Sequence, residues 1–259
     1  MRIRLLAMPV LILCCASPVR AADPGAVASA RRALQAAVSQ GQLEPLMKAR
    51  ARYQALSAAE PGSALLHYWV AVATWRTVPL LKEKDRTQAE RMCQDGLDHC
   101  EAALKLDRGF AGCHAIKAAL QGLMLRFRPA EMMTLGLAID ESFGRAHDLD
   151  PKEPRAWLLD GINALHKPEP FGGGPAAALL LLRRAEEIFA AGAPADSTAP
   201  DWGHDDTLLW MGRAALAKKD SAAAETLYQK ALEVNPEHAW IRQVLLPRLR
   251  AARSGKGTP

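Results

Sequence analysis

Apolar residues follow two different patterns along this chain. Near the start they are continuous, in a stretch from Leu5 to Ala16 that arginines precede and Pro18 follows. With small residues around Ala21, this arrangement is typical of a cleaved secretory signal peptide. The stretch is too short to span a membrane of about 30 Å, and no later stretch approaches that length. We therefore expect residues 1–21 to be removed and the protein to be periplasmic or secreted, with no integral membrane segment.

A lipid anchor is disfavoured, because Leu13 rather than a small residue precedes Cys14. Removing residues 1–21 also lowers the net charge from +5 to +2, since the segment holds three arginines and no acidic residue. The remaining charges are nearly balanced and scattered, so nothing in them indicates binding to nucleic acid.

Beyond the leader, apolar residues lie in stretches rich in alanine and leucine, with few β-branched runs. Alanine and leucine favour helices, whereas strands are enriched in β-branched residues. One run, from Leu179 to Leu182, would make a helix apolar on every side, which is typical of a helix buried between neighbours. The sequence therefore predicts an all-α fold.

The helical pattern also repeats along the chain. The clearest copy reads LLWMGRAALAKKDSAAAETLYQKALEVNP and carries Gly212, Ala224, Tyr228, Ala231 and Pro236. These residues and their spacing resemble the tetratricopeptide repeat (TPR) family. The resemblance implies a solenoid of helical hairpins, in which small residues lie where two helices touch and larger ones fill the space between hairpins.

Weaker copies of these marks occur upstream, for example Trp157 with Gly161 and Phe143 with Ala146. We therefore expect a TPR-like solenoid of about five repeats with a C-terminal capping helix, which covers the apolar face of the last repeat. The expected solenoid is residues 22–252, with repeats at about 26–61, 62–108, 109–151, 152–190 and 204–236, a cap at 237–252 and a disordered tail at 253–259.

Three repeats carry insertions between their two helices. The added stretches are RTVPLLKEKDR, LMLRFRPAE and HKPEPFGGGP, while the joints between the first four repeats keep the length of the family pattern. Turns within hairpins lie along one edge of a solenoid, so the insertions should collect there. The apolar residues of this candidate edge are Leu80, Leu81, Phe127 and Phe171.

The TPR resemblance also implies a concave groove, lined by the first helix of each hairpin. This groove would be largely apolar and would suit an extended peptide or an apolar ligand. Alternatively, the inserted edge or the terminal helix packs into the groove and buries it. The candidate groove residues are Tyr68, Trp75, Arg155, Leu158, Ile162, Leu165, Leu209 and Arg213.

The glycines at 172–174 suggest a phosphate-binding loop at first sight. A loop of the Walker kind needs lysine and a hydroxyl residue after its glycines, but Pro175 and a run of alanine and leucine follow here. A weak anion site at the start of the helix remains an alternative. The simpler interpretation is a turn, in which glycines let the chain fold back and Pro175 occupies the first helical turn.

Cysteine and histidine gather between Cys93 and His114. Their spacing does not bring two close pairs of ligands together, so we expect no structural zinc site. Cys100 and Cys113 flank a predicted turn between antiparallel helices and would face each other. They form either a disulfide, which an oxidising compartment permits, or two small buried thiols.

No arrangement of nucleophile and base, paired carboxylates or metal ligands stands out, so we expect no enzyme and no cofactor. The sequence favours an exported scaffold that holds a protein or peptide on the groove or on the inserted edge. A small apolar or anionic ligand is the alternative occupant. In that alternative the protein is a solute-binding accessory subunit of a periplasmic uptake system, because its glycine-rich stretch and leader are similar to the TPR partner subunits of TRAP-type transporters.

Overall fold

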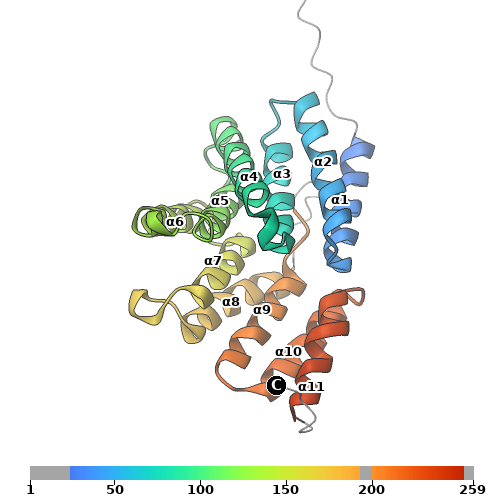
Figure 1. Cartoon of the computed structure of the whole chain (residues 1–259), viewed down its shortest axis with the longest axis vertical. Helices are drawn as coiled ribbons and strands as arrows, with labels where there is room; N and C mark the ends of the chain where they lie inside the picture. Colours follow the sequence, from blue (N-terminus) through green and yellow to red (C-terminus); the bar gives the residue numbers. More distant parts are fainter. Residues whose placement is uncertain (1–23, 193–199, 254–259) are drawn as a thin grey trace, which may run out of the picture.

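The computed structural model describes residues 24–192 and 200–253, and all regular structure in these ranges is helical (Figure 1). The predicted leader and the end of the predicted tail lie outside the described residues. Among the described helices, none has both the length and the hydropathy needed to cross a bilayer. The predicted all-α, TPR-like solenoid is confirmed.

Ten of the helices pair in chain order into five hairpins, and a terminal helix follows them. Each hairpin packs on the first helix of the next hairpin, through the contacts of α2 with α3, α4 with α5, α5 with α7 and α8 with α9. The helices are α1 (Pro24–Gln40), α2 (Leu43–Ala59), α3 (Ala64–Thr77), α4 (Arg86–Leu106), α5 (Ala111–Met124), α6 (Met132–Leu149), α7 (Pro154–His166), α8 (Pro175–Ala190), α9 (His204–Ala217), α10 (Ser221–Val234) and α11 (Leu246–Arg253).

Glycines lie where the two helices of a hairpin touch. A Cβ atom on Gly161 of α7 would lie 2.6 Å from Cγ of Leu182 in α8. In the fifth hairpin, a Cβ on Gly212 would lie 2.5 Å from Cε1 of Tyr228. Real Cβ atoms do not approach other atoms so closely, so these positions need glycine for the helices to pack, as the TPR resemblance implies.

The solenoid bends so strongly that its ends meet. The hairpins follow an arc from α1 to α10, and the first and last come together on the same side (Figure 1). Asn235, just after α10, donates a hydrogen bond of 3.0 Å to the Ser39 hydroxyl in α1 and one of 2.7 Å to the Asp205 carboxylate in α9. The concave side is therefore enclosed by the chain rather than open along its length.

The Leu179–Leu182 run lies on a helix that packs between two neighbours, α7 and α9, as expected, but the four leucines are not equally buried. Leu182 is buried, together with Ala178 and Ala185, but the Leu180 side chain is 69% exposed. The reason is that α8 packs on α7 and α9 from one side. No further layer of the described helices covers its outer face.

The inserted stretches form the connections within hairpins two to four. They contain short 3-10 turns at Val78–Leu80, Glu83–Asp85, Pro129–Glu131 and Glu169–Phe171. Polar contacts join neighbouring connections. The Arg86 guanidinium donates to the Arg126 carbonyl at 2.9 Å, and Arg126 pairs with Glu83 at 3.1 Å.

The three glycines at 172–174 form a turn. Gly172 and Gly174 have φ of 84° and 95°, a conformation that residues with a side chain rarely adopt. All three amides already donate to backbone carbonyls, at 2.9, 3.2 and 2.8 Å, and α8 begins at Pro175. These amides have no hydrogen left for a phosphate, so the turn interpretation holds.

The structure contains no disulfide between Cys100 and Cys113. Both are free, buried thiols, as is Cys93. The Cys113 sulfur lies 3.7 Å from the Cys100 carbonyl oxygen rather than bonded to its sulfur. Of the two alternatives, the structure therefore shows the small buried thiols, which fill the contact between α4 and α5.

Candidate ligand groove

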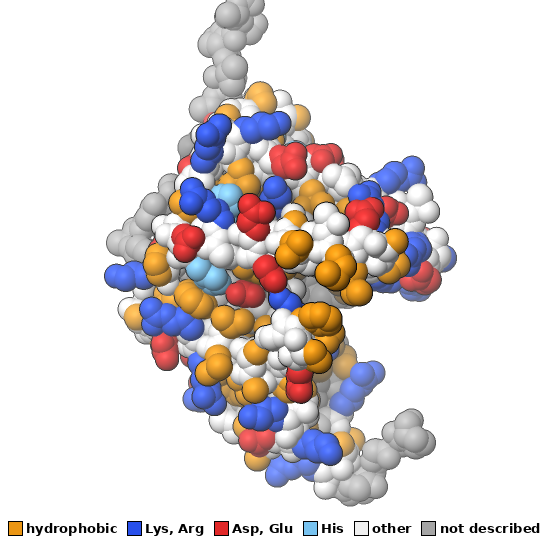
Figure 2. Space-filling view, turned by 90° about the vertical axis from the view of Figure 1, so that its left-hand side faces the viewer, with side chains coloured by type: hydrophobic (Ala, Val, Ile, Leu, Met, Phe, Trp, Pro, Cys, Tyr) orange, Lys and Arg blue, Asp and Glu red, His pale blue; other side chains and the backbone are white. Residues whose placement is uncertain are grey.

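A large hollow lies on the concave side of the molecule, with a volume of about 1330 Å³. Helices α5, α7 and α9 contribute its floor, α6 one wall and residues 238–244 another. Figure 2 shows hydrophobic side chains on both sides of a hollow between two parts of the molecule. We call this hollow the groove; it also receives residues from the α1–α2 turn and from the inserted connections.

The groove gathers most of the exposed apolar side chains. Of the nine large apolar side chains that are exposed in the described residues, six line it, although water contact with such groups is unfavourable. A contiguous exposed apolar patch of this kind is typical of a binding surface. The six residues are Leu80, Met132, Met133, Leu137, Phe171 and Trp240.

The structure divides the predicted site residues into two sets. One set lines the groove, and the other is packed into the protein. The lining residues are Trp75, Ile162, Leu209 and Arg213 from the predicted groove, with Leu80 and Phe171 from the predicted edge. The packed residues are Tyr68, Arg155, Leu158 and Leu165 from the predicted groove, with Leu81 and Phe127 from the edge.

The segment after residue 199 buries the first part of the predicted groove. The Trp202 ring nitrogen donates to the Tyr68 hydroxyl at 3.1 Å, and Arg155 donates to the Pro200 carbonyl at 2.7 Å. A Cβ on Gly203 would lie 3.1 Å from the Leu158 side chain. Part of the concave surface is therefore filled, but by the joint before α9 and not by the inserted edge or the terminal helix that the alternative named, while the part near α6 stays open.

Several residues that line the groove were not predicted from the sequence. Met132, Met133 and Leu137 belong to α6, a second helix, and second helices of TPR hairpins are expected on the convex side. The available signal was the i, i+4 pair of Met133 and Leu137, which places two large apolar residues on one helix face. Trp210 and Trp240 were also missed.

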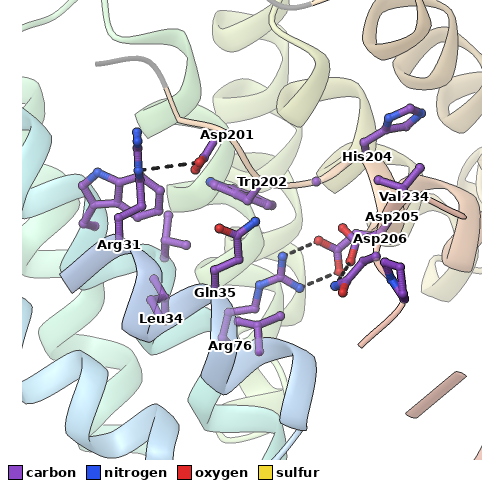
Figure 3. Close-up of a pocket in the computed structure, with 16 residues that line it drawn as sticks. Arg31, Leu34, Gln35, Arg76, Asp201, Trp202, His204, Asp205, Asp206 and Val234 are labelled. Atoms are coloured by element: carbon purple, nitrogen blue, oxygen red, sulfur yellow. Dashed lines mark hydrogen bonds and ion pairs between the residues drawn. The ribbon is translucent and has the colours of Figure 1, made fainter. Parts of the chain in front are cut away.

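A buried ion pair joins α3 to α9 beside the groove (Figure 3). Both terminal guanidinium nitrogens of Arg76 donate hydrogen bonds to the Asp206 carboxylate, one of them at 2.7 Å. The Arg76 and Asp206 side chains are only 13% and 6% exposed. Burial alone would raise the pKa of Asp206, but attraction to Arg76 holds it below its ordinary value.

The Arg76–Asp206 pair is part of a larger joint between the two ends of the solenoid. The Arg76 guanidinium also lies 5.0 Å from the Trp202 ring centroid. Neighbouring Asp205 accepts from Asn235, and burial followed by the charge of Asp206 raises its pKa. A smaller cavity of about 180 Å³ lies at this joint (Figure 3). These contacts close the arc and so hold the walls of the groove in place.

The positive and negative charges that line the groove do not balance. Lys167 pairs with Asp140 at 2.8 Å and Arg76 pairs with Asp206, so these four cancel. Arg126 pairs with Glu83, which lies just outside the lining, so Arg213 is the lining cation that no carboxylate of the described residues pairs with. The groove is therefore apolar with an excess of positive charge. In the described part of the chain, no three side chains of the usual metal-ligating types come together.

Sequence comparison with protein-family profiles and with curated proteins finds no match. Solved structures do match. The HusA haemophore from Porphyromonas gingivalis superposes with a TM-score of 0.62 and 20% identity, covering 75% of this chain and 93% of that chain. A thermophilic TPR protein from Thermus thermophilus gives a TM-score of 0.57 and 15% identity, covering 87% and 99%. At these identities the likeness establishes the TPR-like fold.

Proposed function

We propose that this protein is a non-catalytic binding protein that holds a large, flat, apolar ligand with acidic groups, such as a porphyrin. The observation that carries the proposal is the groove itself. The lining of the groove exposes six large apolar side chains, and the charged residues of the lining leave an excess of positive charge. An apolar molecule with carboxylates would cover the exposed apolar side chains and balance the positive charge.

The similarity to a haemophore supports the choice of ligand. The chain matches nearly the whole length of that protein, which is named for carrying haem. A porphyrin has a flat apolar ring and carboxylate side arms, and so combines the two properties that the groove complements. The size of a porphyrin also suits the groove, whose volume exceeds the roughly 300–1,000 Å³ of ordinary small-molecule pockets.

A protein or peptide partner is the second candidate, and the α6 wall favours it. Met132 and Met133 are 61% and 74% exposed, and methionine is frequent on surfaces that accept varied peptide helices. In this version the protein is a scaffold. Export to the periplasm or beyond is part of both versions and rests on the N-terminal leader pattern. The accessory role beside a transporter likewise stays a prediction.

A titration with protoporphyrin IX and with haem tests the proposal. Trp75, Trp210 and Trp240 line the groove, so a bound porphyrin should quench tryptophan fluorescence and saturate at one equivalent. We expect protoporphyrin IX and haem to bind with similar affinity, because the groove offers apolar contact and positive charge. Absence of saturable quenching with both would contradict the proposal, and a tightly co-purified peptide in native mass spectrometry would support the scaffold instead.

A further inference from the structure

One end of the groove holds a cation between aromatic rings. The Arg213 guanidinium lies 4.5 Å from the Trp210 ring centroid and 5.4 Å from that of Trp240. All three residues line the groove, and Trp240 is 36% exposed. The rings come from α9 and from the start of the C-terminal segment, so two different segments of the chain contact the guanidinium.

Arg213 differs from the other lining cations in its partners. Arg76, Arg126 and Lys167 each pair with a carboxylate, whereas no carboxylate of the described residues pairs with Arg213. Burial lowers the pKa of Arg213, which reflects partial loss of water without a compensating anion. The His166 ring lies near the Trp210 ring, with 5.8 Å between their centroids. Burial and then the charge of Arg213 lower the pKa of His166 from its ordinary value.

A guanidinium in an apolar surrounding binds a carboxylate strongly, because it presents paired donors in a plane. The flanking indole rings would meanwhile cover the apolar body of a flat ligand. We propose that Arg213, held between Trp210 and Trp240, is the residue that selects ligands bearing a carboxylate at this end of the groove. The inference rests on the proposed function and adds the residue that sets its ligand class.

The test compares protoporphyrin IX with its dimethyl ester in one detergent-containing buffer, using the full chain. The ester keeps the flat ring and removes both negative charges. We expect the wild-type protein to bind the acid about 10- to 100-fold more tightly than the ester, the size of one charge-assisted hydrogen-bonded contact. Arg213→Gln should lose this preference while keeping its affinity for the ester, and Arg213→Lys should recover part of it.

Arg126→Gln is the matched control, since Arg126 also lines the groove but already pairs with Glu83. It should keep most of the preference for the acid. Equal binding of acid and ester by the wild type would overturn the role of Arg213 and the preference for acidic ligands, and would leave standing only the binding of a flat apolar molecule in the groove. Binding of neither compound would overturn both. If Arg213→Gln does not fold, as circular dichroism would show, Arg213→Lys decides the inference, because an acid-to-ester ratio equal to that of the wild type would contradict it.

Discussion

Replacing Arg76 by methionine is expected to lower the free energy of unfolding by about 3–5 kcal/mol, because it leaves a buried carboxylate without a partner. The Asp206 side chain is 6% exposed, and its carboxylate accepts hydrogen bonds from both terminal guanidinium nitrogens of Arg76. Methionine keeps much of the arginine stem, so the loss of packing is small. Urea unfolding followed by circular dichroism measures the change.

The double variant Arg76→Met with Asp206→Leu separates charge from packing. Replacing a whole buried ion pair by apolar residues of similar size is often neutral. We therefore expect the double variant to regain most of the lost stability. A single variant as stable as the wild type would show that Asp206 reaches water, and that the joint closing the arc is weaker than its geometry indicates.

Replacing Leu137 by aspartate is expected to weaken porphyrin binding by about 10- to 100-fold, because it removes apolar contact and adds a charge of the same sign as the ligand. Leu137 lies on the α6 wall of the groove and is 71% exposed. The substitution buries no charge in the free protein, so the fold should be retained. Fluorescence titration and circular dichroism on the same sample measure both properties.

Leu180 provides a matched control for this variant. It lies on α8, is 69% exposed, and is not part of the groove. Leu180→Asp should therefore bind porphyrin as the wild type does. Equal weakening in both variants would mean that the effect comes from net charge and not from the groove. The fully buried Leu158, in contrast, is unsuitable for testing binding, because aspartate there would destabilise the core.

The parts of the fold that depend on short-range spacing could be predicted from the sequence. Gly161 and Gly212 stand at the contact between two helices because their neighbours Leu182 and Tyr228 come too close for any side chain. Such contacts repeat with the hairpin, so they leave a periodic pattern. The inserted connections could be located in the sequence for the same reason, because they lengthen the spacing between these periodic positions.

The parts that depend on contacts between distant segments could not be predicted. Trp202 reaches Tyr68 across the concave side, and Arg76 meets Asp206 although 130 residues separate them. Neither contact has a repeating spacing. The sequence therefore predicted one long groove, whereas the structure fills the part near Tyr68 and opens another part beneath α6. The run of leucines in α8 likewise indicated a helix between neighbours, but it could not show that Leu182 is buried whereas Leu180 is exposed.

The central claim is that the ligand lies in the groove between α6, the inserted connections and the C-terminal segment. Amide hydrogen exchange of the full chain, with and without protoporphyrin IX, tests it most directly. We predict slower exchange in residues 125–139, 167–171 and 238–244 on binding, with no change on the outer face of α8. Protection confined to α4 or α8, which contribute no residue to the groove, or no protection at saturating porphyrin, would contradict the account.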